Sequence, residues 1–180
     1  MKTVAAIGNT IFIYLTALLM VLLFTGGKSQ ITTFIWEYLF HNNVFVPLGF
    51  ILIFGMSMYI INILFFLKAR NGNWRALELT RTNMVVKLIQ IPAYLLIFGM
   101  GLLCTLMIFT IGITFVLILL DAFAIGMTGL FAATAFYNLK KEQKITGTMQ
   151  ALYTFASFLF CMDVIAAIIG YHISRSNKTA

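Results

Sequence analysis

The fold of this chain is decided by an apolar hairpin that reads TIGITFVLILLDAFAIGMTGLFAATAFYN over residues 110–138, LKKEQKITGT over 139–148 and MQALYTFASFLFCMDVIAAIIGY over 149–171. About 20 apolar residues are enough to cross the hydrocarbon layer of a bilayer as a helix, and both legs of the hairpin reach that length. Each leg carries one carboxylate, Asp121 in the first and Asp163 in the second. Because an acidic side chain is costly inside a membrane, this pair is a functional-site hypothesis from the outset.

The composition excludes a water-soluble domain. Hydrophobic residues make up 62% of the 180 residues and charged residues 9%, and the mean hydropathy is +1.01. Soluble domains have about 45–50% apolar and about 25% charged residues, so this chain has too few charges to cover a surface in water. The formal charge of +7 favours contact with lipid headgroups over nucleic acid, because the basic residues cluster in short loops between apolar runs. The two cysteines, Cys104 and Cys161, are too isolated for a disulfide framework or a metal cluster.

The pattern predicts an all-α integral membrane protein, a five-span transmembrane helical bundle that forms a single domain over residues 1–180. Gly26–Gly27 is expected to end the first span, and the apolar break at Thr110–Gly112 separates the third span from the fourth. Residues 83 to 138 cannot form a single crossing, because that stretch is far longer than a bilayer requires. The five spans are predicted at about 4–25, 44–67, 83–109, 113–137 and 149–171.

The segment Lys28–Asn43 predicts a short interfacial helix in the first extracytoplasmic loop. Its apolar residues recur at helical spacing, and Trp36 and Tyr38 are residue types that gather where a membrane meets water. A lid over a binding site is the alternative interpretation of this segment.

The distribution of basic residues predicts the orientation in the cell membrane. Five spans place the chain ends on opposite sides, and cytoplasmic loops carry an excess of Lys and Arg. A cytoplasmic N-terminus and an extracytoplasmic C-terminus give nine basic residues inside and three outside. The nine are Lys2, Lys68, Arg70, Arg75, Arg81, Lys87, Lys140, Lys141 and Lys144, and the three are Lys28, Arg175 and Lys178.

The two acids are predicted to face the bundle interior at one depth. Small residues share the helical stripe of each acid, and small residues mark helix contacts in lipid. Both acids lie roughly 22–26 Å along their helices from the basic turn, in the outer half of the membrane. Tyr14, Ser57 and Thr128 are the hydroxyl-bearing candidates to join them in an ion, proton or helix-packing site. The small residues are Ala124, Ala132 and Ala135 beside Asp121, and Ala156, Ala166, Ala167 and Gly170 beside Asp163.

No basic residue is expected at that depth, and two carboxylates without a counter-ion cannot both stay charged in a low dielectric. Two interpretations follow. In the first, the acids are protonated and hydrogen-bond neighbouring helices as packing groups. In the second, they bind a proton, a cation or a cationic solute from the outer side.

A second polar stripe is predicted on the third span, where Lys87, Gln90 and Tyr94 share a face. Lys87 is expected on the cytoplasmic side, where its long side chain can reach headgroups. Gln90 is expected to bond a neighbouring helix, with Asn9 and Asn62 as partners at a similar level. A cytoplasm-facing cavity lined by this stripe is the alternative.

Three functions from different classes remain. We expect a non-enzymatic accessory or interaction subunit in contact with the lipid bilayer, working as a homo-oligomer or beside another membrane protein. A proton- or cation-coupled transporter of a small solute, using the Asp pair, is the alternative, and an intramembrane enzyme is third. No protease, hydrolase or phosphate-binding motif is found, and no cofactor is expected. A metal site of Glu37, His41 and His172 is possible in space but is not expected, because no acidic ligand cluster accompanies the histidines.

Overall fold

The computed structural model describes residues 1–25, 30–72, 74–106, 111–159 and 161–176 of the chain. Within these ranges every regular element is a helix. Several residues to which the sequence analysis assigned helix ends or charges lie outside the described residues, namely Gly26, Gly27, Lys28, Thr110 and Lys178.

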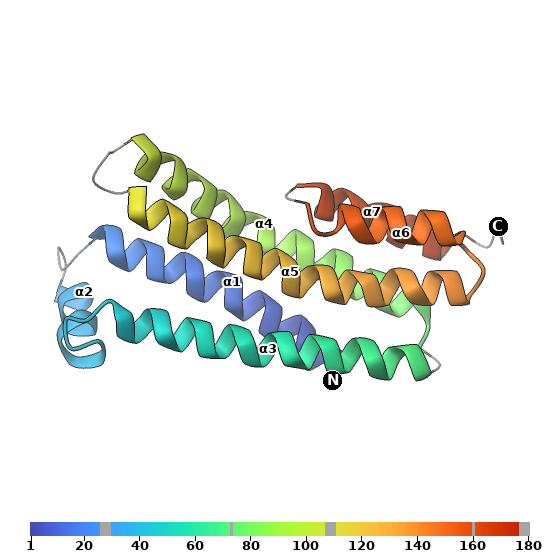
Figure 1. The fold of residues 1–180 in the computed structure, drawn as a ribbon, viewed down its shortest axis with the longest axis horizontal. Coiled ribbons are helices and arrows are strands. Elements are labelled where there is room, and N and C mark those ends of the chain that lie inside the picture. Colours follow the sequence, from blue (N-terminus) through green and yellow to red (C-terminus); the bar gives the residue numbers. More distant parts are fainter. Residues whose placement is uncertain (26–29, 73, 107–110, 160, 177–180) are drawn as a thin grey trace.

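Four long helices form the body of the molecule (Figure 1). All four are long and apolar enough to cross a membrane, and no other helix among the described residues is. They correspond to the first four predicted spans and suggest a multi-pass membrane protein. Their bounds are Lys2–Thr25 for α1, Phe45–Asn71 for α3, Ala76–Leu106 for α4 and Ile111–Lys141 for α5.

The predicted fifth span is not confirmed, because the helix is interrupted within it and the chain turns back. Residues 149–171 belong to two short helices, α6 (Gly147–Ala156) and α7 (Met162–Arg175). At 1.5 Å per residue these helices are about 15 and 21 Å long, short of the roughly 30 Å of hydrocarbon. Figure 1 shows them side by side and antiparallel along α4 and α5. Together they form a re-entrant hairpin, a helical pair that enters the bundle and leaves by the same end.

Local backbone interactions explain why α6 ends where it does. The Ser157 amide donates to the carbonyls of Tyr153 and Thr154, and the Ser157 hydroxyl donates to the Tyr153 carbonyl at 2.8 Å. The chain then reverses, and Cys161 takes a φ of 65° just before α7 begins. Few non-glycine residues adopt this left-handed conformation, and here it marks the tip of the hairpin. The residues of the turn are mostly apolar, so hydropathy alone does not reveal it.

The hairpin brings the end of α7 to the end of the bundle where α1 and α4 begin. Lys2 pairs with Glu78 in the first turn of α4, and the Thr80 hydroxyl lies 2.7 Å from the Ser174 hydroxyl of α7. Lys144, in the turn after α5, donates to the Ser174 carbonyl at 2.5 Å. We call the end of the bundle that contains Lys2, Glu78, Lys144 and Ser174 the basic end. Arg175 therefore lies at the same end of the bundle as Lys2. The prediction placed these two residues on opposite sides of the membrane, and the structure does not support that placement.

The segment predicted to be an interfacial helix is helical, in two short pieces at the opposite end of the bundle. These are α2 (Gln30–Phe34) and the π-helical turn η1 (Ile35–Leu39), and neither has a buried residue. The indole nitrogen of Trp36 donates to the Leu22 carbonyl at 3.3 Å, which ties the segment to α1. Figure 1 shows it joining α1 to α3.

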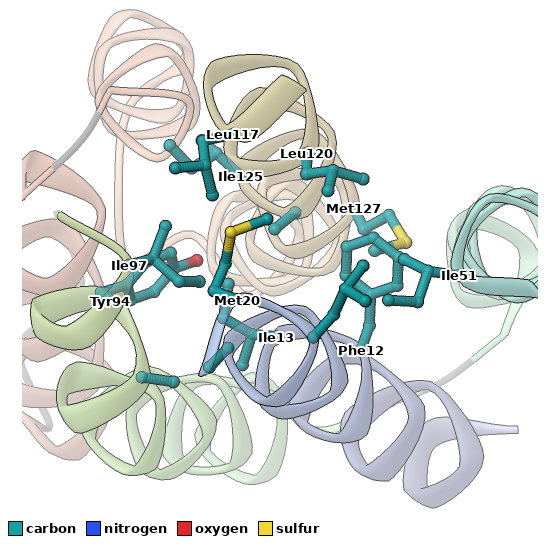
Figure 2. Close-up of a cluster of buried hydrophobic side chains, with 14 of the residues drawn as sticks. Phe12, Ile13, Met20, Ile51, Tyr94, Ile97, Leu117, Leu120, Ile125 and Met127 are labelled. Atoms are coloured by element: carbon teal, nitrogen blue, oxygen red, sulfur yellow. The ribbon is translucent and has the colours of Figure 1, made fainter. Parts of the chain in front are cut away.

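The apolar core lies where α1, α3, α4 and α5 meet. Figure 2 shows side chains from these helices converging, with Phe12 and Met127 among those that are fully buried. The predicted small-residue stripe of α5 faces inward, since Ala124, Ala132 and Ala135 are all buried. This close packing is what allows polar side chains on α4 and α5 to meet inside the bundle.

The hairpin predicts a specific membrane topology. In a variant without the native cysteines (Cys104→Ala, Cys161→Ser), single cysteines at Ser176 and Asn71 should react with a membrane-impermeant maleimide from the same side. A cysteine at Asn43 should react from the opposite side. If Ser176→Cys reacted together with Asn43→Cys, the chain would cross the membrane a fifth time and the hairpin would be wrong.

Candidate functional site in the membrane interior

A buried ion pair joins α4 to α7 near the middle of the bundle. The Lys87 ammonium pairs with Oδ2 of Asp163, and the two residues are 0% and 3% exposed. The same ammonium donates to the Thr128 hydroxyl of α5 at 2.5 Å, while that hydroxyl lies 3.1 Å from the Ala124 carbonyl of its own helix. Three helices are thus tied together by one ammonium group.

The hairpin is what brings Asp163 to Lys87. Asp163 lies in the first turn of α7, and its Oδ1 accepts a hydrogen bond from the Val164 amide at 2.8 Å. A helix N-terminus favours a negative charge, so the start of α7 stabilises this carboxylate as well. Because α7 begins inside the bundle, its N-terminal acid meets a lysine that would otherwise have no partner in lipid.

The expectation that Lys87 reaches lipid headgroups is wrong. The helix α4 begins at Ala76, seven residues before the predicted start of the span, so Lys87 lies eleven residues into the helix. This corresponds to about 16 Å from the helix start, and the side chain is fully buried within the bundle. The expectation that the acids have no positive partner is therefore also wrong.

Asp121 lies on the same face of α5 as Thr128, seven residues or about 10 Å farther from the basic end. Its Oδ1 atom is buried and accepts no hydrogen bond from any described residue. Asp121 also lines a cavity of about 250 Å³ between α4 and α5. The other residues of that cavity include Ile97, Phe98, Gly101, Thr105 and Leu117.

The surroundings of the two predicted acids thus differ from those expected. Asp163 and Asp121 are not two free carboxylates at one depth between two full crossings. Asp163 is in direct contact with the Lys87 ammonium, whereas Asp121 lies about two helical turns along α5 from Thr128, which also bonds that ammonium.

The polar stripe of α4 passes through this cluster. Thr80, Asn83, Lys87, Gln90 and Tyr94 recur every three or four residues, and all are buried. They lie on one face of a single helix, which gives the bundle interior a polar line from its basic end to its middle.

Asn9 of α1 supplies a partner for Gln90, and Asn62 of α3 bonds Asn9. The Gln90 side-chain nitrogen donates to the Asn9 carbonyl of α1 at 3.1 Å. Asn9 and Asn62 exchange two side-chain hydrogen bonds of 3.1 and 2.8 Å between α1 and α3. Buried amides that satisfy each other in this way hold helices in register inside lipid.

Tyr14 and Ser57 are not part of the cluster. The Tyr14 hydroxyl donates to the Ile89 carbonyl of α4 at 2.8 Å, and the side chain is partly exposed. Ser57 is exposed and donates to the Ile53 carbonyl of its own helix at 2.9 Å. Both residues were assigned by helical depth alone, which does not specify the direction in which a side chain points.

The structure does not bring His41 and His172 together. His41 follows η1, whereas His172 lies in the last turn of α7 at the basic end. Among the described residues no three His, Cys, Asp or Glu side chains are grouped so that they could hold a metal ion.

Comparisons with protein-family models, with curated proteins and with solved structures find no match to this chain. The chemistry of the site therefore rests on its own geometry. Two carboxylates and one ammonium, all inside the bundle, carry a net charge of −1 when ionised. One further positive charge neutralises the cluster, and a low dielectric strongly favours neutrality.

The ion pair predicts a pattern of stability in three variants. Lys87→Met and Asp163→Leu should each destabilise the protein by about 3–5 kcal/mol, because each leaves a buried charge without its partner. The double variant Lys87→Met/Asp163→Leu should recover most of that loss, because neither charge remains. The stability of each purified variant can be measured in mild detergent by unfolding it with heat or with a denaturing detergent. Losses that simply add in the double variant would show that the two side chains do not interact.

Proposed function

We propose that this chain is a membrane transport protein that couples movement of a cation or cationic solute to movement of a proton. The observation that carries the proposal is that buried Lys87 pairs with Asp163, while a second carboxylate, the partly buried Asp121 of α5, has a buried oxygen that no described residue bonds. A cluster with this composition binds one additional positive charge, which can be supplied by a proton or by a cation. Competition between the two for one site is the physical basis of exchange.

The architecture supports this use of the cluster. Helices that begin part-way through a bilayer are tolerated where they are buried in protein or line a cavity, and they recur at binding sites of transporters. In this chain the N-terminal turn of α7 holds Asp163, and the cavity beside α5 holds Asp121. Asp163 is thus fixed in the pair with Lys87, while Asp121 lines the cavity.

The residues have distinct proposed roles. Asp121, which lines a cavity, takes the proton or the cation. Lys87 shares its charge between Asp163 and Asp121, so that neutralising either acid strengthens its attraction to the other. Thr128 holds the ammonium on the α5 side in both situations. The polar stripe from Tyr94 to Thr80 offers a proton path toward the basic end.

We place the basic end in the cytoplasm of the cell, because it carries an excess of Lys and Arg over the opposite end. On this orientation the N-terminal end of α1 and the end of α7 both face the cytoplasm. The segment Gln30–Leu39 then lies at the outer interface, and the cavity of Asp121 lies in the outer half of the membrane.

Exchange can be measured in proteoliposomes that contain the pH indicator pyranine. A pulse of Na⁺, K⁺ or tetraphenylphosphonium on one side should move protons in the opposite direction, and Asp121→Asn should abolish the response. Ser57→Ala is the control, because Ser57 bonds only its own helix among the described contacts and should leave the response unchanged. A folded native protein that gives no response to any of these cations would overturn the proposal.

An interaction subunit is a second candidate, favoured by the incomplete cover of α4 and α5. Figure 1 shows the hairpin alongside only the half of these helices nearest the basic end. Beyond the hairpin tip, the residues that line the cavity of Asp121 all come from α4 and α5, and no other described helix contributes to its wall. A second copy or another membrane protein packed there would enclose the acid.

Native mass spectrometry in a mild detergent tests the homo-oligomeric form of this idea. We expect a dimer or a higher oligomer, and Gly101→Leu should reduce it, because the added side chain fills the cavity wall. Gly49→Leu is the matched control, because its position has open space around it. A strictly monomeric native protein would contradict a homo-oligomer.

A further inference from the structure

Three arginines converge on one cavity at the basic end. A cavity of about 540 Å³ is lined by Arg75 and Arg81, at the start of α4, and by Tyr171 and Arg175, at the end of α7. All three arginines are exposed, and none forms an ion pair with a carboxylate in the part of the chain that the structure describes. The hairpin creates this cluster, because it returns Arg175 to the end where α4 begins.

The acid in the same cavity does not cancel the positive charge. Glu78 also lines the cavity, but it is paired with Lys2 of α1. With that pair neutral, the three guanidinium groups leave the cavity with a charge of about +3. A guanidinium group donates two parallel hydrogen bonds to phosphate oxygens, which makes an arginine cluster a phosphate site in preference to a site for a neutral ligand.

An apolar groove begins beside the arginine cavity. It has a volume of about 530 Å³, runs between α1 and α4, and shares Glu78 and Arg81 with the cavity. Its walls include Ile7, Ile11 and Ile89. From Glu78 to Ile89 is eleven residues, or about 16 Å along α4, which is close to half of the roughly 30 Å hydrocarbon layer.

We propose that this composite site binds an anionic phospholipid, with the phosphate among Arg75, Arg81 and Arg175 and an acyl chain in the groove between α1 and α4. A phosphate site alone would accept any soluble phosphate ester. The groove adds an apolar surface of one leaflet's depth directly beside the phosphate site, and only a lipid fills both. Basic pockets between transmembrane helices bind anionic lipid headgroups in this way.

The site is separate from the cluster of Lys87, Asp121 and Asp163, and it does not depend on the proposed transport. It joins α1, α4 and α7 at the base of the hairpin. A bound lipid would therefore fix the hairpin against the bundle at the end where Thr80 and Ser174 meet.

Native mass spectrometry of the full chain in mild detergent, titrated with phosphatidylglycerol, tests the proposal. The test variant is Arg75→Gln/Arg81→Gln/Arg175→Gln. The matched control is Lys68→Gln/Arg70→Gln/Lys140→Gln, which removes the same charge from the same end but from residues outside the cavity. We expect phosphatidylglycerol to bind the test variant at least tenfold more weakly than it binds the control. Phosphatidylcholine with the same acyl chains should bind the native protein more weakly than phosphatidylglycerol.

Two outcomes would overturn the proposal. Equal weakening in the two triple variants would mean that lipid responds to the overall charge of the basic end and not to this cavity. Competition by glycerol 1-phosphate at the same concentration as the lipid would mean that the arginines bind a soluble phosphate ester and that the groove contributes nothing. Because all of the substituted side chains are exposed, both triple variants should fold, and gel filtration of each checks this.

Discussion

The structure depends on how a lysine and an aspartate are kept inside an apolar bundle. An isolated charge in hydrocarbon is so unfavourable that it is either neutralised or given a partner. Lys87 and Asp163 meet this requirement together, with Thr128 as a further acceptor and the N-terminal turn of α7 as a further source of positive potential. The pair cannot form unless a helix begins inside the bundle. The re-entrant hairpin is therefore inseparable from the ion pair.

The need of a buried charge for a partner also bears on Asp121, the third charged group of the cluster. A single buried ion pair is neutral and needs nothing more. Asp121 adds a second carboxylate on α5, about two helical turns from Thr128, and one of its oxygens is buried without a hydrogen bond from a described residue. The interior of the bundle is thus short of one positive charge. Protons and small cations supply such a charge reversibly, whereas a purely structural network would be expected to satisfy all of its members.

Much of the architecture could be predicted from the sequence, because hydropathy over 20 residues is a strong signal. The four long helices and their order follow from the apolar runs, and the inward stripe of Ala124, Ala132 and Ala135 follows from helical spacing. The break in the last apolar run could not be found in this way. Residues 157–161 contain neither Gly nor Pro, and they are as hydrophobic as the helices on either side. A weaker signal was present, since an acid such as Asp163 is typical of the first turn of a helix.

The depth predicted for Asp163 depended on the predicted fifth span. With a continuous fifth span, Asp163 would lie level with Asp121, and Lys87 would be left near the headgroups. Once α7 begins at Met162, Asp163 moves to the depth of Lys87, and the cluster changes from two like charges to three charges that nearly balance. Contacts between residues 76 positions apart depend on where the chain reverses, and a one-dimensional pattern does not contain that information.

We propose that the cluster takes up one positive charge at Asp121. Infrared difference spectroscopy of the protein in a lipid bilayer, between high and low pH, measures this directly through the carbonyl band of a protonated carboxylic acid. The account predicts one such band from a buried acid, lost in Asp121→Asn and retained in Glu78→Gln. A spectrum without a protonated-acid band, or a band that Asp121→Asn leaves unchanged, would contradict it.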